Sequence, residues 1–250
     1  IMFDRKWKKI IIFCLLFTLI FVTTITLHII LPKQSALAIK EQEWEMLLKQ
    51  KDFIQAVNKV EQHWEKDYEN YFDKNLADFS LTGEEIGETL KNLSQKTNTK
   101  PAVIWTWQRE RQMQIILITP GQKPEMYTVT DLAKEKLIKT ARSLNVEITN
   151  PRNRNTISYL EPAQKLYKWI VKPLEFRLET EKIDTIMFCL SENLRTLPLA
   201  ALHDGKRFLI EKYAITQIPA FNLIDISYNK IKNAQILAMG ASESVSYTHL

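Results

Sequence analysis

The sequence predicts an α/β protein with helices first, a β-meander next, and buried strands with packed helices completing a mixed sheet. Three observations support this fold class. Apolar residues recur at three- and four-residue spacings from Ile39 to about Lys96, which is the period of amphipathic helices. After Asn98 the period shortens to that of strands. Beyond residue 159 one long helical face and two largely apolar runs follow, a pattern typical of buried parallel strands with helices packed on them.

The composition is that of a folded globular chain rather than a disordered one. Apolar residues make up 45% and charged residues 25% of the 250 residues, enough for one large or two small domains. The formal net charge of +5 comes mostly from residues 1–38, which hold five of the 34 basic and one of the 29 acidic residues. The remaining chain is nearly neutral and has no basic field to attract phosphates, so nucleic acid is excluded as a partner.

Residues 1–38 have the architecture of a membrane-targeting segment. A basic head, Asp4–Lys9, precedes an apolar run without charges from Ile10 to Ile30. Ala36–Ala38 offers the small residues that a signal peptidase accepts, so we expect cleavage after Ala38. The apolar run is also close to the roughly 20 residues that span a bilayer. An uncleaved anchor therefore remains an alternative, and a buried helix in a soluble protein is the third.

The charge distribution of this segment also predicts its orientation. The basic residues precede the apolar run, which favours an N-terminus inside the cytoplasm and a soluble part outside it. We therefore expect the protein to be exported or anchored to the membrane.

Residues 39–81 are predicted to form a helical adaptor, a pair of amphipathic helices with a turn at Lys49–Asp52. The apolar stripe comprises Trp44, Leu47, Leu48, Phe53, Ala56, Val57, Val60, Trp64, Tyr68, Tyr71 and Phe72. Stripes at helical spacing are usually core, so we interpret this one as core, with an aromatic ligand platform as the alternative. His63 lies in the charged stretch Glu61–Lys66, which we interpret as a solvated helix face.

A second helix and a meander are predicted next. Thr82, followed three residues later by Glu85, is a capping-box pattern that predicts a helix over Thr82–Ser94. The predicted strands are Ala102–Trp107, Met113–Thr119 and Met126–Val129, and a further helix is expected over Asp131–Leu144. A polar loop, Asn150–Asn155, closes this part of the chain.

The longest apolar helical face follows. Its residues are Leu160, Ala163, Leu166, Tyr167, Ile170, Val171, Leu174 and Leu178. Pro173 is expected to kink this helix because proline cannot donate the helical hydrogen bond. Ile183–Leu190 and Gln235–Met239 are predicted as buried strands that lie parallel in one sheet.

The two cysteines do not define a disulfide framework. Cys14 lies in the apolar leader, and Cys189 lies inside the predicted strand Thr185–Leu190. Cys189 could be a nucleophile or a small core residue. We interpret it as core, because a nucleophilic thiol needs exposure and a neighbouring base.

The segment Leu194–Tyr213 contains residues that are typical of a chain turn. Pro198 fixes its entry, and Asp204–Gly205 turns the chain, so Lys206–Tyr213 is expected to return as a strand. His203 beside Asp204 suggests a catalytic dyad, but adjacent side chains on an extended segment point to opposite faces. We therefore assign both residues to the turn.

The residues of this same segment, LRTLPLAALHDGKRFLIEKY, closely resemble the CHAT domain, a bacterial caspase-like family often attached to tetratricopeptide repeats. Further similar stretches are Tyr159–Tyr167, Trp169–Pro173, Ile183–Ile186, Ile218–Ala220 and Ile236–Ala241. We expect residues 82–242 to be the N-terminal portion of such a domain. The piece Lys51–Ala56 resembles a tetratricopeptide helix junction, so residues 39–81 are interpreted as a remnant of such a repeat.

The resemblance also implies where the catalytic residues of such a domain would lie. Family members carry a histidine, and later a cysteine, after strands that follow the one matching Ile236–Gly240, and this chain ends before either. Ser244–Leu250 departs from the family and resembles a translated sequencing adapter. We interpret residues 243–250 as a non-native tail, which removes His249 from consideration, with a natural C-terminus as the alternative.

The sequence therefore assigns no catalytic, cofactor-binding or metal-binding residue. The expected function is the front part of a caspase-like cysteine peptidase that lacks its catalytic histidine and cysteine. A non-catalytic interaction scaffold on the same fold is the alternative, and a small exported binding domain, complete as it stands, is the third hypothesis. The expected partners are proteins or peptides, and the membrane through the leader.

Overall fold

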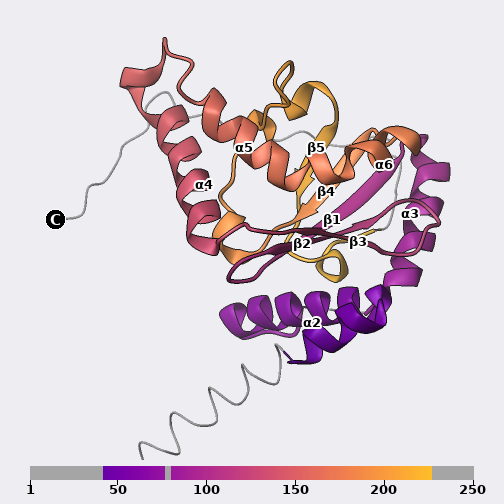
Figure 1. Ribbon diagram of the computed structural model, residues 1–250. Coiled ribbons are helices and arrows are strands. Elements are labelled where there is room, and N and C mark those ends of the chain that lie inside the picture. Colours follow the sequence, from indigo (N-terminus) through magenta and orange to yellow (C-terminus); the bar gives the residue numbers. More distant parts are fainter. Residues whose placement is uncertain (1–41, 77–79, 227–250) are drawn as a thin grey trace, which may run out of the picture.

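The computed structural model of the protein describes residues 42–76 and 80–226 (Figure 1). The leader with Cys14 and His28, the predicted strand Gln235–Met239 and the tail with His249 lie outside these residues. Within the described ranges, no helix is both long and apolar enough to cross a membrane.

Five strands form one mixed sheet in the order β3-β2-β1-β4-β5. They are β1 (Pro101–Gln108), β2 (Met113–Ile118), β3 (Glu125–Val129), β4 (Thr185–Cys189) and β5 (Ala214–Gln217). The first three are antiparallel neighbours, which confirms the predicted meander. β4 lies parallel to β1, and β5 lies parallel to β4. The fold class is thus confirmed as α/β with a mixed sheet.

Helices cover both faces of this sheet (Figure 1). The helix over residues 42–50, α2 (Phe53–Phe72) and α3 (Gly83–Thr97) pack on one face. On the other face lie α4 (Lys134–Thr149), α5 (Leu160–Ile170) and α6 (Glu175–Thr180). Side chains alternate between the two faces of a strand, so β1 sends Ile104 into one core and Trp105 into the other.

The helix ends follow the local signals of the sequence. Lys51, with a φ of 54°, separates the helix over residues 42–50 from α2, and Asp52 caps α2 through the backbone N–H of Gln55. The turn predicted at Lys49–Asp52 is confirmed. Thr82 and Glu85 form the predicted capping box at the start of α3.

The apolar stripe of α2 is core over most of its length but not at its end. Trp44 and Trp64 are buried in the core that faces β1. By contrast, Tyr71 is 81% exposed and Phe72 is 53% exposed. The core interpretation is therefore wrong for these two residues, because the buried side of α2 ends at Glu65.

The segment expected as one kinked helix is interrupted. α5 ends at Ile170, a 3-10 turn spans Lys172–Leu174, and α6 begins at Glu175. Pro173 lies in that 3-10 turn and cannot donate a backbone hydrogen bond, so the helix stops rather than bends. The apolar face nevertheless stays continuous, because Leu166, Leu174 and Leu178 all enter the same core.

The prediction of a strand over Lys206–Tyr213 is wrong. His203 and Phe208 form only an isolated bridge, and the chain then makes a 3-10 turn over Leu209–Glu211. Strand alternation would place residues 209, 211 and 213 on one face, which would bury Glu211. The turn instead buries Leu209 and Tyr213 and leaves Glu211 exposed, so that its carboxylate accepts the backbone N–H of Phe208. The following strand is β5.

Candidate functional site

Cys189 ends β4 in the core on the α2 side of the sheet. Its side chain is fully buried and forms no disulfide. Burial, with a smaller contribution from the charge of Glu61, raises the pKa of the Cys189 thiol well above its usual value. The predicted burial of Cys189 is confirmed, and its environment favours a protonated thiol over the thiolate that a nucleophile requires.

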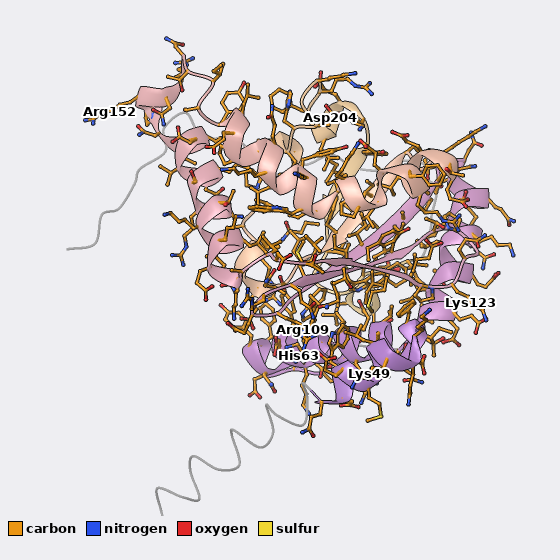
Figure 2. All side chains as sticks on the ribbon, viewed as in Figure 1. Lys49, His63, Arg109, Lys123, Arg152 and Asp204 are labelled. Carbon is orange, nitrogen blue, oxygen red and sulfur yellow. The ribbon has the colours of Figure 1, made fainter. Side chains whose placement is uncertain are left out.

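The two described histidines lie on opposite sides of the sheet. Figure 2 shows His63 on α2 and Asp204, the neighbour of His203, beyond α5. His63 Nε2 is 3.7 Å from Asp67 Oδ2, and its ring meets Trp107 edge-on. His203 accepts the backbone N–H of Gly205 at Nδ1. Neither histidine joins Cys189, because one packs on a helix surface and the other belongs to a turn.

His203 and Asp204 have separate partners, as the turn assignment predicts. The carboxylate of Asp204 accepts the backbone N–H groups of Lys206 and Arg207 at 2.7 and 2.8 Å, and the Nζ of Lys212 lies 3.1 Å from Oδ2. Burial by itself would raise the pKa of Asp204, but these donors hold that pKa well below its usual range. Asp204 therefore stabilises the turn and is not bonded to the imidazole.

A buried lysine organises a polar cluster that the sequence did not indicate. Lys212 Nζ lies 2.8 Å from the hydroxyl of Tyr167, 2.9 Å from Glu175 Oε1 and 3.1 Å from Asp204 Oδ2. Burial alone would lower the pKa of Lys212, yet its three oxygen partners raise that pKa above the usual value. The ammonium of Lys212 therefore links α5, α6 and the turn at Asp204 through hydrogen bonds.

Glu61 forms a second polar link, between the adaptor and the sheet. Its Oε1 accepts the indole N–H of Trp105 at 2.5 Å and the backbone N–H of Phe221 at 3.0 Å. Its Oε2 accepts the backbone N–H of Asn222 at 3.0 Å. Burial raises the pKa of Glu61, although the three donors oppose this effect.

Glu65, one helical turn further along α2, completes this link. It accepts the side-chain amide of Asn222 at 2.6 Å, and the carbonyl of that amide accepts the backbone N–H of Leu81 at 3.1 Å. The interpretation of Glu61–Lys66 as a solvated face is therefore wrong for Glu61 and Glu65, which are 1% and 9% exposed. Their partners lie at least 40 residues away in sequence, and no local spacing reveals them.

Two cavities open on the α2 side of the molecule. One, of about 370 Å³, is lined by Trp44, His63, Trp107 and neighbouring side chains of the two adaptor helices. The other, of about 380 Å³, lies between Tyr68 and Tyr71 of α2 and Arg195, beyond the carboxyl end of β4. Ligands of open α/β sheets bind outside the carboxyl ends of the strands, so the second cavity has the position expected of a functional site.

No cluster for a metal ion is present in the part of the chain that the structure describes. Residues 42–76 and 80–226 contain no group of three or more His, Cys, Asp or Glu side chains placed to hold one. Within the described residues, the buried thiol of Cys189 is influenced by the charge of the buried carboxylate of Glu61. A carboxylate with three donors already bound has little capacity left to orient a thiol.

The structure thus defines a mixed α/β domain with helices on both faces of its sheet. Residues 160–248 match the family model of the CHAT domain. The resemblance inferred from Leu194–Tyr213 is confirmed at the level of the family. The match begins at α5, further along the chain than Thr82, where the similarity was expected to begin. A comparison with curated proteins finds no match to the chain.

Proposed function

We propose that this chain is the front part of a caspase-like cysteine peptidase, whose catalytic histidine and cysteine are encoded further along its gene. The match to the CHAT domain over residues 160–248 carries this proposal. The parallel arrangement of β1, β4 and β5 supports it, because such an arrangement gathers loops at one edge of a sheet. In the complete protein the histidine would polarise the thiol, and the thiolate would attack the peptide carbonyl.

The described residues themselves are proposed to hydrolyse no peptide bond. Acyl transfer by cysteine needs a thiol, a base within hydrogen-bond reach and donors for the developing oxyanion. Cys189 is buried in β4, His63 is edge-on to Trp107, and His203 is bound to the turn at Gly205. These positions support an inactive framework rather than a second catalytic centre.

The test compares two proteins on a panel of peptide and protein substrates. One is residues 39–242, and the other extends to the natural end of the gene. We expect turnover only by the longer protein, and its loss when the downstream cysteine is replaced by alanine. Turnover by the shorter protein that vanishes in Cys189→Ala would overturn the proposal.

A non-catalytic interaction scaffold is the second candidate function. It is favoured by the bonds of Glu61 and Glu65 to Trp105 and Asn222, which fasten the adaptor helix to the sheet and make a rigid platform. The exposed aromatic side chains of Tyr71 and Phe72 on that helix suit a protein or peptide partner. Reading the gene past Ser242 separates the two functions, because a scaffold needs no downstream histidine and cysteine.

We also propose that the protein is exported or anchored to the membrane, with its soluble part outside the cytoplasm. The support lies in the sequence of residues 1–38, with a basic head, an apolar run and small residues at Ala36–Ala38. Its partners would then be extracytoplasmic proteins or peptides. The near-neutral charge of the remaining chain argues against nucleic acid.

A further inference from the structure

A polar cavity of about 320 Å³ lies on the side of the sheet opposite the adaptor. It is bounded by α5, the 3-10 turn at Pro173 and the turn at Asp204, and its lining includes Gln164, Lys168, Lys172 and His203. In Figure 2 the label of Asp204 marks this region, beyond α5 and far from His63. Cys189, the free thiol of the described residues, lies in the core on the other face of the sheet.

The acidic groups beside this cavity already have cationic, N–H or O–H partners. The carboxylate of Asp204 is bonded to two backbone N–H groups and to Lys212. The carboxylate of Glu175 is bonded to Tyr167, Lys172 and Lys212. Because both negative charges are compensated within the protein, they do not repel an incoming anion as free carboxylates would.

Basic groups at the cavity remain available. Lys168 forms no ion pair with any residue of the described ranges, and its side chain lines the cavity. Lys206 and Arg207 follow Asp204 and Gly205 on the exposed turn and add to the positive field. The ammonium of Lys168 is therefore a charge-bearing donor with room for an acceptor.

The imidazole of His203 supplies a neutral donor at the same place. Gly205 donates its backbone N–H to Nδ1 at 2.9 Å, so Nδ1 is unprotonated and the ring hydrogen is on Nε2. Phe208 holds the ring edge-on with 4.9 Å between centroids. Gln164 adds a side-chain amide to the lining. Together these residues surround the cavity with N–H donors and a net positive charge.

We propose that this cavity binds a carboxylate, carried by an acidic side chain of a peptide. The ammonium of Lys168 would pair with the carboxylate, and the Nε2–H of His203 would donate to it. Lys172 contributes positive charge but remains paired with Glu175. The proposal does not depend on peptidase activity, because it assigns a recognition site on the other side of the sheet.

The test follows the imidazole of His203 by nuclear magnetic resonance in the ¹⁵N-histidine-labelled protein. Three probes are titrated at low salt: a capped Glu-Glu dipeptide, the matched Gln-Gln dipeptide and inorganic phosphate. We expect saturable shifts of the Nε2 resonance with Glu-Glu and none with Gln-Gln. Binding that is stronger for phosphate than for Glu-Glu would overturn the carboxylate assignment.

Two lysine variants separate a defined site from diffuse attraction. Lys168→Gln should weaken the binding of Glu-Glu by about threefold to fivefold, as expected for an exposed ion pair. Lys165→Gln is the matched control, since Lys165 lies on the same helix but pairs with Glu161 and does not line the cavity. Equal weakening by both variants, or no saturable shift in the parent protein, would overturn the proposal. These titrations measure binding and not turnover, so failure of the carboxylate-binding proposal would leave the proposed peptidase function untouched.

Discussion

Trp105 on β1 donates its indole N–H to the carboxylate of Glu61 on α2 across 2.5 Å, in the buried layer between helix and sheet. Glu61 is 1% exposed, and its second oxygen binds the backbone of Asn222. A buried carboxylate is costly unless donors surround it. Here three donors from two distant parts of the chain do so, and the adaptor is thereby fastened to the sheet.

Replacing Glu61 by glutamine should destabilise the protein. Glutamine offers one acceptor oxygen and one NH₂ group, so at least one of the three N–H donors would face another donor. A buried donor left without an acceptor costs roughly 1–3 kcal/mol. Urea unfolding followed by tryptophan fluorescence measures the loss. Glu88→Gln is the control, because Glu88 is exposed and pairs only with Lys91. Equal stability of Glu61→Gln and the parent would contradict this account.

The Lys212 cluster predicts a specific loss of stability in acid. Burial would raise the pKa of Glu175, but the hydrogen bonds from Lys172, Lys212 and Tyr167 lower that pKa from 4.5 to about 2. The folded protein therefore holds this proton less tightly than the unfolded chain does. The carboxylate stabilises the fold above pH 4.5, and this contribution is lost as the pH falls through about 2.

Glu175→Gln tests this linkage. The free energy of unfolding of the variant should be lower than that of the parent near neutral pH, and the difference should shrink below pH 4.5. Denaturant unfolding at a series of pH values measures it. Glu161→Gln serves as the control, because Glu161 is an exposed partner of Lys165 on α5. A difference that stays constant down to pH 2 would refute the assignment of the shift to Glu175.

Cys189 should resist thiol reagents in the folded protein. The side chain is fully buried, and burial raises the pKa of its thiol, so both access and thiolate formation are suppressed. In residues 39–242, which lack Cys14, the rate of labelling by a disulfide reagent should be low without urea and high in unfolding concentrations of urea. Rapid labelling of the native protein would show that Cys189 is exposed and reactive.

Gly87 should be intolerant of a side chain, although it lies in the interior of α3. An added Cβ would lie 2.4 Å from the carbonyl oxygen of Gln122, and the backbone N–H of Gly121 donates to the carbonyl of Gly87 at 2.8 Å. Alanine normally stabilises a helix relative to glycine by about 1 kcal/mol. Here the added Cβ clashes with the backbone, so Gly87→Ala should instead lower the free energy of unfolding by about 1–3 kcal/mol. Thermal unfolding of Gly87→Ala, beside Ser94→Ala in the same helix, measures the effect. An increase in stability for Gly87→Ala would disprove close packing of α3 on this turn.

Export can be tested at the N-terminus of the mature protein. Cleavage after Ala38 predicts that protein recovered from a bacterial host begins at Ile39. Retention of the leader in a membrane fraction would instead identify the uncleaved anchor. Soluble cytoplasmic protein that retains Trp7 would refute both forms of targeting.

Several elements could be predicted because their signals are local. The capping box of Thr82 and Glu85 uses two residues three positions apart, and it starts α3 as expected. The meander follows from strand-like runs joined by short polar turns, and neighbours in sequence become neighbours in the sheet. The burial of Cys189 follows from its place in a wholly apolar run. The resemblance to the CHAT domain likewise rests on contiguous residues.

The failed expectations involve residues whose roles depend on distant partners. The spacing of Leu209 and Tyr213 is compatible with either a strand or a turn. The turn forms because it brings both side chains into the core. Glu61 stands among charged residues and was assigned to solvent, yet it binds Phe221, which is 160 residues away. Tyr71 continues the apolar stripe of α2 but extends past its buried side.

The sequence by itself determined the periodicities, the caps, the buried strands and the family resemblance, because each depends on residues close together in the chain. Only the tertiary structure decided that Lys212 would gather Tyr167, Glu175 and Asp204, and that Glu61 would meet Trp105. The physical reason is desolvation. A charged side chain enters the interior only where folding brings enough opposite charges or hydrogen-bond donors around it, and the packing of helices on both faces of the sheet brings those partners together.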